Sequence, residues 1–303
     1  MINVAQAAIE FSIIIFYVFV LFIIITSRVK NFRNAFYSMF VATGIADATS
    51  LFANCLIRVN SELYLGEEFR LVLLILIMVS GTTFIAHMLG NMFITINRYS
   101  AVCLMHNYDK IWARRNVWIV IGIQYAVSFM VYFHTIRTKM VYIRNANGTF
   151  SYGGLENDID KINRFIYVSV CLVYALVSVS LNARLLMEGR RLLKMSRSRH
   201  GRHERGLLLN AFLVFIFTML MCTQQVMRGI AVFINDDNLN TVAKMHFYWI
   251  NDAMISVPPL SLLLLSTELR RDIVNFFTCK RDHINFSSST CVATQREFAS
   301  RTR

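Results

Sequence analysis

The chain has 303 residues, of which 56% are apolar and 16% are charged, and its formal net charge is +13. In soluble domains about a quarter of all residues are charged, so much of the apolar surface of this chain is expected to face lipid. The basic residues lie between hydrophobic runs rather than along one soluble face, which argues against a nucleic-acid-binding protein. Only two prolines and twelve glycines leave little room for a turn-rich or β-barrel architecture.

Seven apolar runs follow one another along the chain, each near the roughly 20 residues that a spanning helix needs. Inside lipid every backbone amide must be paired within its own segment, so these runs are predicted to be helices. The predicted fold is therefore all-α, a seven-transmembrane helix bundle. The predicted spans are 7–26, 36–57, 71–96, 117–133, 165–186, 207–234 and 247–266.

The distribution of Lys and Arg predicts the orientation of the bundle. Of the 31 basic residues, 22 fall after the first, third and fifth spans or in the C-terminal tail, if Arg184 at the end of the fifth span is counted with the connection that follows it. The side richer in Lys and Arg is cytoplasmic, which puts the N-terminus outside and the C-terminus inside. The sequon at Asn147 then lies in an outer loop and is a predicted glycosylation site, whereas the sequon at Asn285 is cytoplasmic and should stay unmodified.

The cytoplasmic side has two segments of distinct composition. The connection 190–205 is strongly basic, as expected of a solvated loop near anionic lipid. After the last span, Leu269, Ile273 and Phe276 recur at helical spacing, which predicts a short amphipathic helix on the membrane surface. Cys279 follows and is a candidate palmitoylation site or a free thiol. Residues 1–278 are expected to form one domain, and 279–303 a disordered cytoplasmic tail.

Polar residues recur every three or four positions in three of the spans, which places them on one face of each helix. Polar groups in lipid are costly and usually face the bundle interior, where they either hydrogen-bond between helices or serve a function. The three stripes are Thr43, Asp47, Ser50 and Asn54; Ser80, Thr83, His87 and Asn91; and Tyr167, Cys171, Tyr174, Ser178 and Asn182. The first span has almost nothing polar and is expected to be a peripheral, lipid-facing helix.

Three charged residues stand out well inside the predicted spans: Asp47, Arg228 and Asp252. Each needs a partner, a water-filled cavity or a ligand, because an unpaired charge there is costly. Arg228 and Asp252 lie at similar depth and are predicted to form an ion pair. The sequence leaves open whether Asp47 pairs with His87, holds a proton or binds a cation. His87 has no companions at metal-ligand spacing, so no metal site is predicted.

Several motifs mark a family. The triplet Asn97-Arg98-Tyr99 at the cytoplasmic end of the third span resembles the Asp-Arg-Tyr triplet of rhodopsin-like G-protein-coupled receptors. The wider run 96–103, followed by 108–112, is similar to the nematode serpentine chemoreceptors, closest to their gamma-type superfamily and its V class. The segments 44–47, 251–260 and 266–270 resemble the second span, the seventh span and the segment that closes it in this family.

The sequence also departs from rhodopsin-like receptors. No cysteine lies where their outer disulfide would need one, near Leu71 or between His134 and Lys161. Thr223-Gln224-Gln225 stands at about the depth of their Trp-x-Pro bend, and 257–260 replaces their Asn-Pro-x-x-Tyr motif. The activation mechanism of rhodopsin-like receptors is therefore not carried over as a whole.

The resemblance implies a chemosensory receptor of the plasma membrane, expected in a sensory cilium, that binds a small external ligand and activates a heterotrimeric G protein. The predicted ligand-binding residues are Ser80, Thr83, Phe84, Tyr167, Gln224, Gln225, Arg228, Asn251 and Asp252. Asp47, His87 and Asn91 are expected to form a polar core. The predicted coupling residues are Asn97, Arg98, Tyr99, Arg190, Arg191, Lys194 and Glu204. Because Asn97 replaces the usual acid beside Arg98, the resting partner of Arg98 is predicted to be Glu204.

Other classes fit the sequence less well. A transporter with a charged coupling site in the bundle would usually show internal repeats and broken helices, and neither is apparent. An insect-type odorant-gated channel has the opposite orientation. No nucleophile–base pattern indicates an enzyme, and nothing indicates a cofactor. Apart from membrane lipid, the ligand and the G protein, the sequence implies no partner, and it does not define the oligomeric state.

Overall fold

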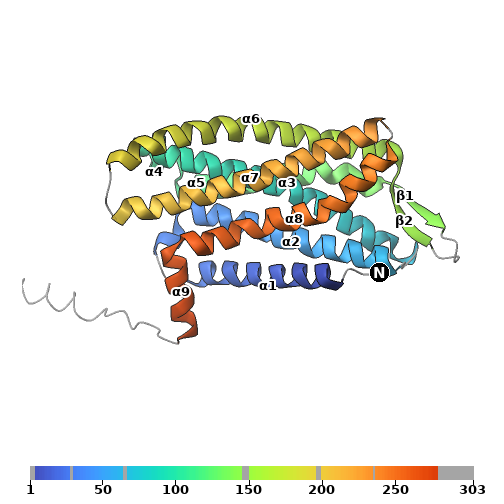
Figure 1. Ribbon diagram of the computed structural model, residues 1–303, viewed down its shortest axis with the longest axis horizontal. Helices are drawn as coiled ribbons and strands as arrows, with labels where there is room; N and C mark the ends of the chain where they lie inside the picture. The colour runs from blue at the N-terminus through green and yellow to red at the C-terminus, as the bar shows by residue number, and fades with distance from the viewer. Residues whose placement is uncertain are drawn as a thin grey trace, which may run out of the picture.

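The computed structural model describes residues 4–27, 30–63, 67–144, 150–195, 199–234 and 236–278. Within these ranges, seven helices are long and apolar enough to cross a membrane. They are α1 (Val4–Thr26), α2 (Ala35–Leu63), α3 (Arg70–Cys103), α5 (Arg114–Tyr132), α6 (Asn157–Met195), α7 (Arg199–Ile234) and α8 (Asp237–Leu265). Figure 1 shows them side by side in one elongated bundle, which confirms the predicted seven-span architecture.

Short elements connect the long helices. They are η1 (Lys30–Arg33), η2 (Glu67–Phe69), η3 (Met105–Asn107), α4 (Tyr108–Ile111), η4 (Phe133–Arg137), β1 (Met140–Arg144), β2 (Phe150–Leu155) and α9 (Thr267–Phe277). The two strands pair antiparallel as a hairpin, so the fold is nearly all-helical rather than purely α. The N-terminus and this hairpin lie at one end of the bundle, and α4 and α9 lie at the other (Figure 1). The end with the hairpin is the predicted outer end.

The connection predicted as a basic loop is largely helical. Helix α6 continues to Met195 and α7 begins at Arg199, so both helices extend well past the apolar runs that marked the spans. Arg, Lys, Leu, Met and Glu are good helix formers, and a helix keeps its backbone hydrogen bonds in water as well as in lipid. Hydropathy therefore predicted the apolar, membrane-spanning part of α6 and α7, but not the residues at which these helices end and begin.

The predicted helix after the last span is present as α9. The side chain of Ser266 caps it by accepting a hydrogen bond from the backbone N–H of Leu269. Leu269 is fully buried, and the Phe276 ring packs edge-on against Phe19 and Phe22 of α1. Ser27 at the end of α1 also hydrogen-bonds to Asp272. Helix α9 thus turns away from the bundle but stays attached to α1 (Figure 1).

The polar stripes predicted for α2, α3 and α6 turn inward. Asp47, His87 and Ser178, one from each stripe, are at most 2% exposed. Large apolar side chains such as Leu172 and Leu176 are instead exposed on the outer face of α6. This is the arrangement expected where polar groups are costly in lipid and apolar side chains are not.

The first span, expected to be a peripheral, lipid-facing helix, exposes one apolar face but also has a buried polar face that was not predicted. Gln6, Glu10 and Tyr17 of α1 are all buried, and Glu10 forms a salt bridge with Arg58 of α2. These residues are four and seven positions apart, so they share one face of the helix. That face packs against the bundle, whereas Phe11, Ile15 and Val18 are exposed. Three polar residues in a long apolar run were too few to stand out as a stripe.

Candidate functional site

A cavity of about 540 Å³ lies between the helices at the end of the bundle that carries the hairpin. Residues of α2, α3, α5, α6, α7 and α8 line it, and Gly154 and Leu155 of β2 contribute to it from the hairpin. Gly154 has a φ of 138°, a backbone conformation that favours glycine. Pockets for small molecules commonly have volumes of roughly 300–1,000 Å³, so this cavity has a suitable size.

The structure brings together six of the nine residues predicted to bind a ligand. They are Ser80, Phe84, Tyr167, Gln225, Arg228 and Asn251. The other three do not line the cavity. The Thr83 hydroxyl donates to the Val79 carbonyl on its own helix at 2.8 Å, and Gln224 Nε2 donates to the Ala243 carbonyl at 2.9 Å, which ties α7 to α8. Asp252 is buried beside the cavity.

Several lining residues were not predicted. Ser50 and Asn54 belong to the inward stripe of α2, which was predicted to hydrogen-bond between helices or to serve a function but was not assigned to the ligand site. Asn54 Oδ1 accepts a 2.7 Å hydrogen bond from Ser80 Oγ. Their inward face was visible in the sequence, although their position beside the cavity was not. Asn163 and Arg164 lie just outside the apolar run predicted as the fifth span. Hydropathy there does not indicate whether a side chain points into the bundle or away from it.

An aromatic cluster of Phe84, Tyr132 and Tyr167 forms one wall of the cavity. The Tyr167 hydroxyl donates to the Tyr132 hydroxyl at 2.9 Å, and the Phe84 and Tyr167 rings meet edge-on with centroids 5.0 Å apart. Gly81 makes this arrangement possible, because a Cβ atom there would lie 2.2 Å from the Tyr132 ring. The close approach of α5 to α3 thus depends on the missing side chain of Gly81.

The charged lining consists of one acid and two arginines. Arg164 Nη2 donates to Asp160 Oδ1 at 3.2 Å, and its guanidinium lies 5.7 Å from the centre of the Tyr167 ring. The Arg228 guanidinium lies 5.2 Å from the centre of the Phe247 ring. Among the described side chains, no acid lies within salt-bridge distance of Arg228.

The predicted ion pair between Arg228 and Asp252 is therefore not formed. Asp252 lies in the field of Arg58, which is itself bound to Glu10. Arg228 is instead close to Arg164 and Asp160. Similar depth along two helices did not imply contact, because the direction of each side chain depends on how its helix is rotated in the bundle.

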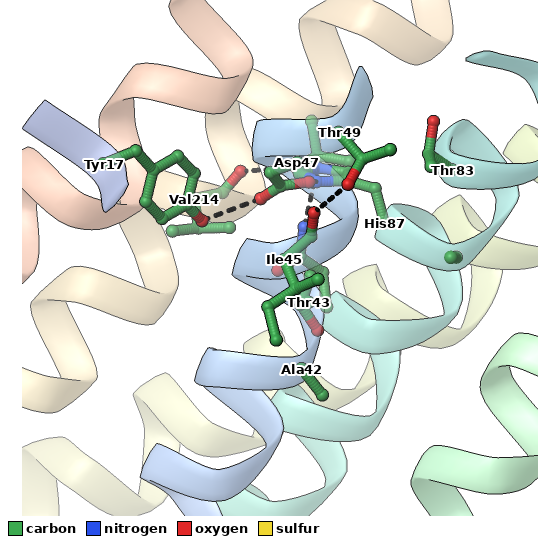
Figure 2. A network of polar contacts seen from close by, with 12 residues as sticks. Tyr17, Ala42, Thr43, Ile45, Asp47, Thr49, Thr83, His87 and Val214 are labelled. Carbon is green, nitrogen blue, oxygen red and sulfur yellow. Dashed lines mark hydrogen bonds and ion pairs between the residues drawn. The ribbon is translucent and has the colours of Figure 1, made fainter. Parts of the chain in front are cut away.

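Below the cavity, Asp47 is held from two sides (Figure 2). Tyr17 of α1 donates to Asp47 Oδ2 at 2.8 Å, and His87 Nδ1 of α3 lies 2.6 Å from Asp47 Oδ1. The other ring nitrogen of His87 lies 2.7 Å from Asn91 Nδ2. Asp47 and His87 are at most 2% exposed. Of the alternatives left open by the sequence, the structure therefore shows pairing with His87, and Asp47, His87 and Asn91 form a connected polar core.

At the opposite end of the bundle, the two halves of the motif around Arg98 contact each other. Asn97 Nδ2 donates to the Tyr108 hydroxyl at 3.1 Å, and Trp112 Nε1 donates to Ser100 Oγ at 2.6 Å. Both bonds hold the segment containing α4 against the end of α3. Arg98 is 5% exposed, and its guanidinium lies 3.9 Å from the centre of the Phe36 ring. Tyr99 is half-buried.

The remaining predictions fall outside the described part of the chain. Arg190, Arg191 and Lys194 lie on α6 and Glu204 lies on α7, but the positions of their side chains are not described. Asn147 and Cys279 lie outside the described residues altogether. Their roles in coupling, glycosylation and palmitoylation stay predictions.

The comparison with known families agrees with this architecture. Residues 6–279 match the family described as serpentine type 7TM GPCR chemoreceptor Srv. No curated protein matches the sequence. The family match covers all seven spans and most of the chain, and it confirms the resemblance drawn from the motifs. The protein is thus a multi-pass plasma-membrane protein that belongs to the Srv family of serpentine seven-transmembrane chemoreceptors, a class of G-protein-coupled receptors.

Proposed function

We propose that this chemoreceptor binds a small external molecule in the cavity at the hairpin end and activates a heterotrimeric G protein at the opposite end. One observation carries the proposal: six residues chosen from the sequence as ligand contacts line a single cavity of suitable size. Convergent polar groups in a largely formed pocket are typical of small-molecule sites.

Helix α3 offers a route between the two ends. Ser80 lines the cavity, His87 and Asn91 belong to the polar core, and Arg98 lies at the inner end, all on one helix. A ligand shifts a two-state bundle only if it binds one state better than the other. A ligand that contacts α3, α6, α7 and α8 at once is well placed to favour one packing of these helices.

Dissociation of a heterotrimeric G protein in cultured cells, measured against a panel of small odorants and water-soluble metabolites, tests this proposal. For each compound that activates the wild type, Phe84→Ala should raise the half-maximal concentration at least about tenfold, which corresponds to the loss of about 1.4 kcal/mol of binding. Phe129→Ala is the matched control, because Phe129 is 46% exposed on the outer face of α5 whereas Phe84 is 7% exposed.

Two further results decide between mechanisms. Arg98→Ala should abolish G-protein dissociation at an unchanged surface level. Equal responses of Phe84→Ala and Phe129→Ala would contradict the proposed site. Accumulation of a radiolabelled panel compound inside the cells, with no G-protein response, would favour the transporter alternative.

A further inference from the structure

We infer that the ligand of the outer cavity is a small organic anion, such as a carboxylate or sulfonate, with an apolar body. This inference rests on the proposed function and names the chemical class that the same site would take. Among the charged side chains that line the cavity, Arg164 forms a salt bridge with Asp160, with 3.2 Å between Nη2 and Oδ1. Arg228 has no acidic partner among the described side chains. The side chains that line the cavity therefore carry one positive charge in excess, while Asp252 is buried beside the cavity and outside this lining.

Arg228 is the centre of this excess charge. Its Nε atom is buried without a hydrogen-bond partner among the described residues. Its guanidinium group lies over the face of the Phe247 ring. Arg164 lines the same cavity and repels it. A charge at this depth is costly unless it is paired, and a guanidinium binds carboxylate and phosphate-like groups through two parallel hydrogen bonds. An anionic group beside Arg228 would pair with its guanidinium and would offset the repulsion between Arg228 and Arg164.

The remaining polar lining also favours an acceptor-rich ligand. Among the residues that line the cavity, three buried donor atoms have no partner in the described part of the chain, against two acceptors. The donors are Arg164 Nε, Arg228 Nε and Asn163 Nδ2, and the acceptors are Gln225 Oε1 and Asn240 Oδ1. Buried polar groups in native proteins are nearly always hydrogen-bonded. The surplus of donors matches the oxygens of an acid better than the N–H groups of an amine.

The body of the ligand follows from the other walls. Phe84, Tyr132, Tyr167 and Phe247 present aromatic side chains around the cavity. An inorganic anion would leave most of the 540 Å³ unfilled and these rings without contact. An acid with an aromatic or aliphatic body would fill the space, pack against the rings and place its charge beside Arg228.

The test uses two thiol reagents of similar size and opposite charge, which makes it independent of any known agonist. Ser80→Cys is introduced at the cavity wall in a Cys55→Ser background, because Cys55 is half-buried on the neighbouring helix α2. A sulfonate-bearing and a trimethylammonium-bearing methanethiosulfonate are applied separately to intact cells. The reaction rates are followed by the loss of labelling with a fluorescent maleimide, after subtraction of the rate without Ser80→Cys.

The ratio of the anionic rate to the cationic rate should exceed that of a free thiol in solution. Arg228→Gln should lower this ratio, because loss of a positive charge slows the anionic reagent and speeds up the cationic one. At an effective dielectric constant near 20, a unit charge at a distance of roughly 10 Å changes each rate by about tenfold, and therefore changes the ratio by on the order of a hundredfold. Arg70→Gln makes the same charge change at the exposed start of α3 and should leave the ratio nearly unchanged. Asp160→Asn should raise it.

Each other result overturns the inference in a way that can be separated from the proposed function. If neither reagent reaches Ser80→Cys from outside, nor Gln225→Cys on the facing helix, the cavity is not an external site and both ideas fail. If both reagents react but Arg228→Gln does not lower the ratio, or Arg70→Gln lowers it equally, only the anion inference fails. It also fails if a purely cationic agonist keeps its potency in Arg228→Gln.

Discussion

The carboxylate of Asp47 makes two short contacts with two different helices, through Tyr17 of α1 and His87 of α3. Because all three side chains are almost fully buried, no water can readily replace a lost partner. Removing one member of such a buried hydrogen-bonded pair is more costly than replacing both, because the single change leaves a buried polar group without that partner. These contacts therefore connect α1, α2 and α3 at the centre of the bundle.

His87→Ala should consequently lower the stability of the purified receptor by about 1–3 kcal/mol, the cost of leaving a buried polar group without one of its hydrogen-bond partners, while Tyr17 still donates to Asp47. The double variant Asp47→Asn, His87→Ala replaces both members of the pair and should recover part of the loss. His246→Ala is the matched control, because His246 is exposed and contacts only the Val242 carbonyl through its ring. Thermal unfolding in detergent measures all three, and equal melting temperatures for His87→Ala and His246→Ala would refute the role of the pair.

Gly81, which packs against Tyr132 of the cavity wall, and Gly122, which has open space around it, offer a sharp comparison. Gly81→Ala should push Tyr132 away from α3, because the new Cβ atom would lie 2.2 Å from its ring, and should break its bond to Tyr167. Gly122→Ala meets nothing within 4 Å and should stabilise α5 by about 0.5–1 kcal/mol through helix propensity. Melting temperatures should therefore move in opposite directions, with agonist response lost only in Gly81→Ala. A shift of the same sign in both variants would contradict the packing described here.

At the scale of elements, the sequence predicted which face of a helix points inward, but it did not predict which side chains on neighbouring helices meet. The stripes on α2, α3 and α6 were predictable because a spacing of three or four residues fixes a helix face directly. The contact partners of Arg228 and Asp252 were not, because they depend on the relative rotation of α7 and α8. The hairpin was missed because each strand is short and lies between spans, where hydropathy carries no signal.

The candidate site follows the same rule. Residues on the inward face of a span, such as Phe84 and Asn251, could be chosen from their position in the sequence. Asn163 and Arg164 could not, because they lie past the apolar run on the part of α6 that extends beyond it. The contribution of Gly154 and Leu155 required the folded hairpin, since only the pairing of β1 and β2 positions them at the cavity.

The extension of α7 to Arg199 meets one condition for the predicted resting contact between Arg98 and Glu204, because it places Glu204 on the helix. Arg98 is 5% exposed, so loss of an acidic partner on α7 should destabilise the resting state. Glu204→Ala should then raise basal G-protein activation several-fold at equal surface expression. Asp109→Ala, an exposed acid on α4, is the control. Unchanged basal activity in Glu204→Ala, or an equal rise in Asp109→Ala, would speak against the contact.

Across the whole molecule, the two regions proposed for ligand binding and for G-protein coupling lie at opposite ends. The cavity lies beside the hairpin and the N-terminus, and Arg98, α4 and α9 lie at the far end (Figure 1). This separation is what a receptor needs in order to sense a molecule on one side of a membrane and act on a protein on the other. The central claim of this account is that the cavity end faces outward.

The glycosylation state of Asn147 tests that claim most directly, because Asn147 lies between β1 and β2 in the chain and the hairpin they form contributes to the cavity. With the cavity outside, glycosidase treatment should shift the wild type by one glycan and leave Asn147→Gln unshifted, while Asn285→Gln behaves like the wild type. A glycan that persists in Asn147→Gln and disappears in Asn285→Gln would place the cavity on the cytoplasmic side and contradict the account.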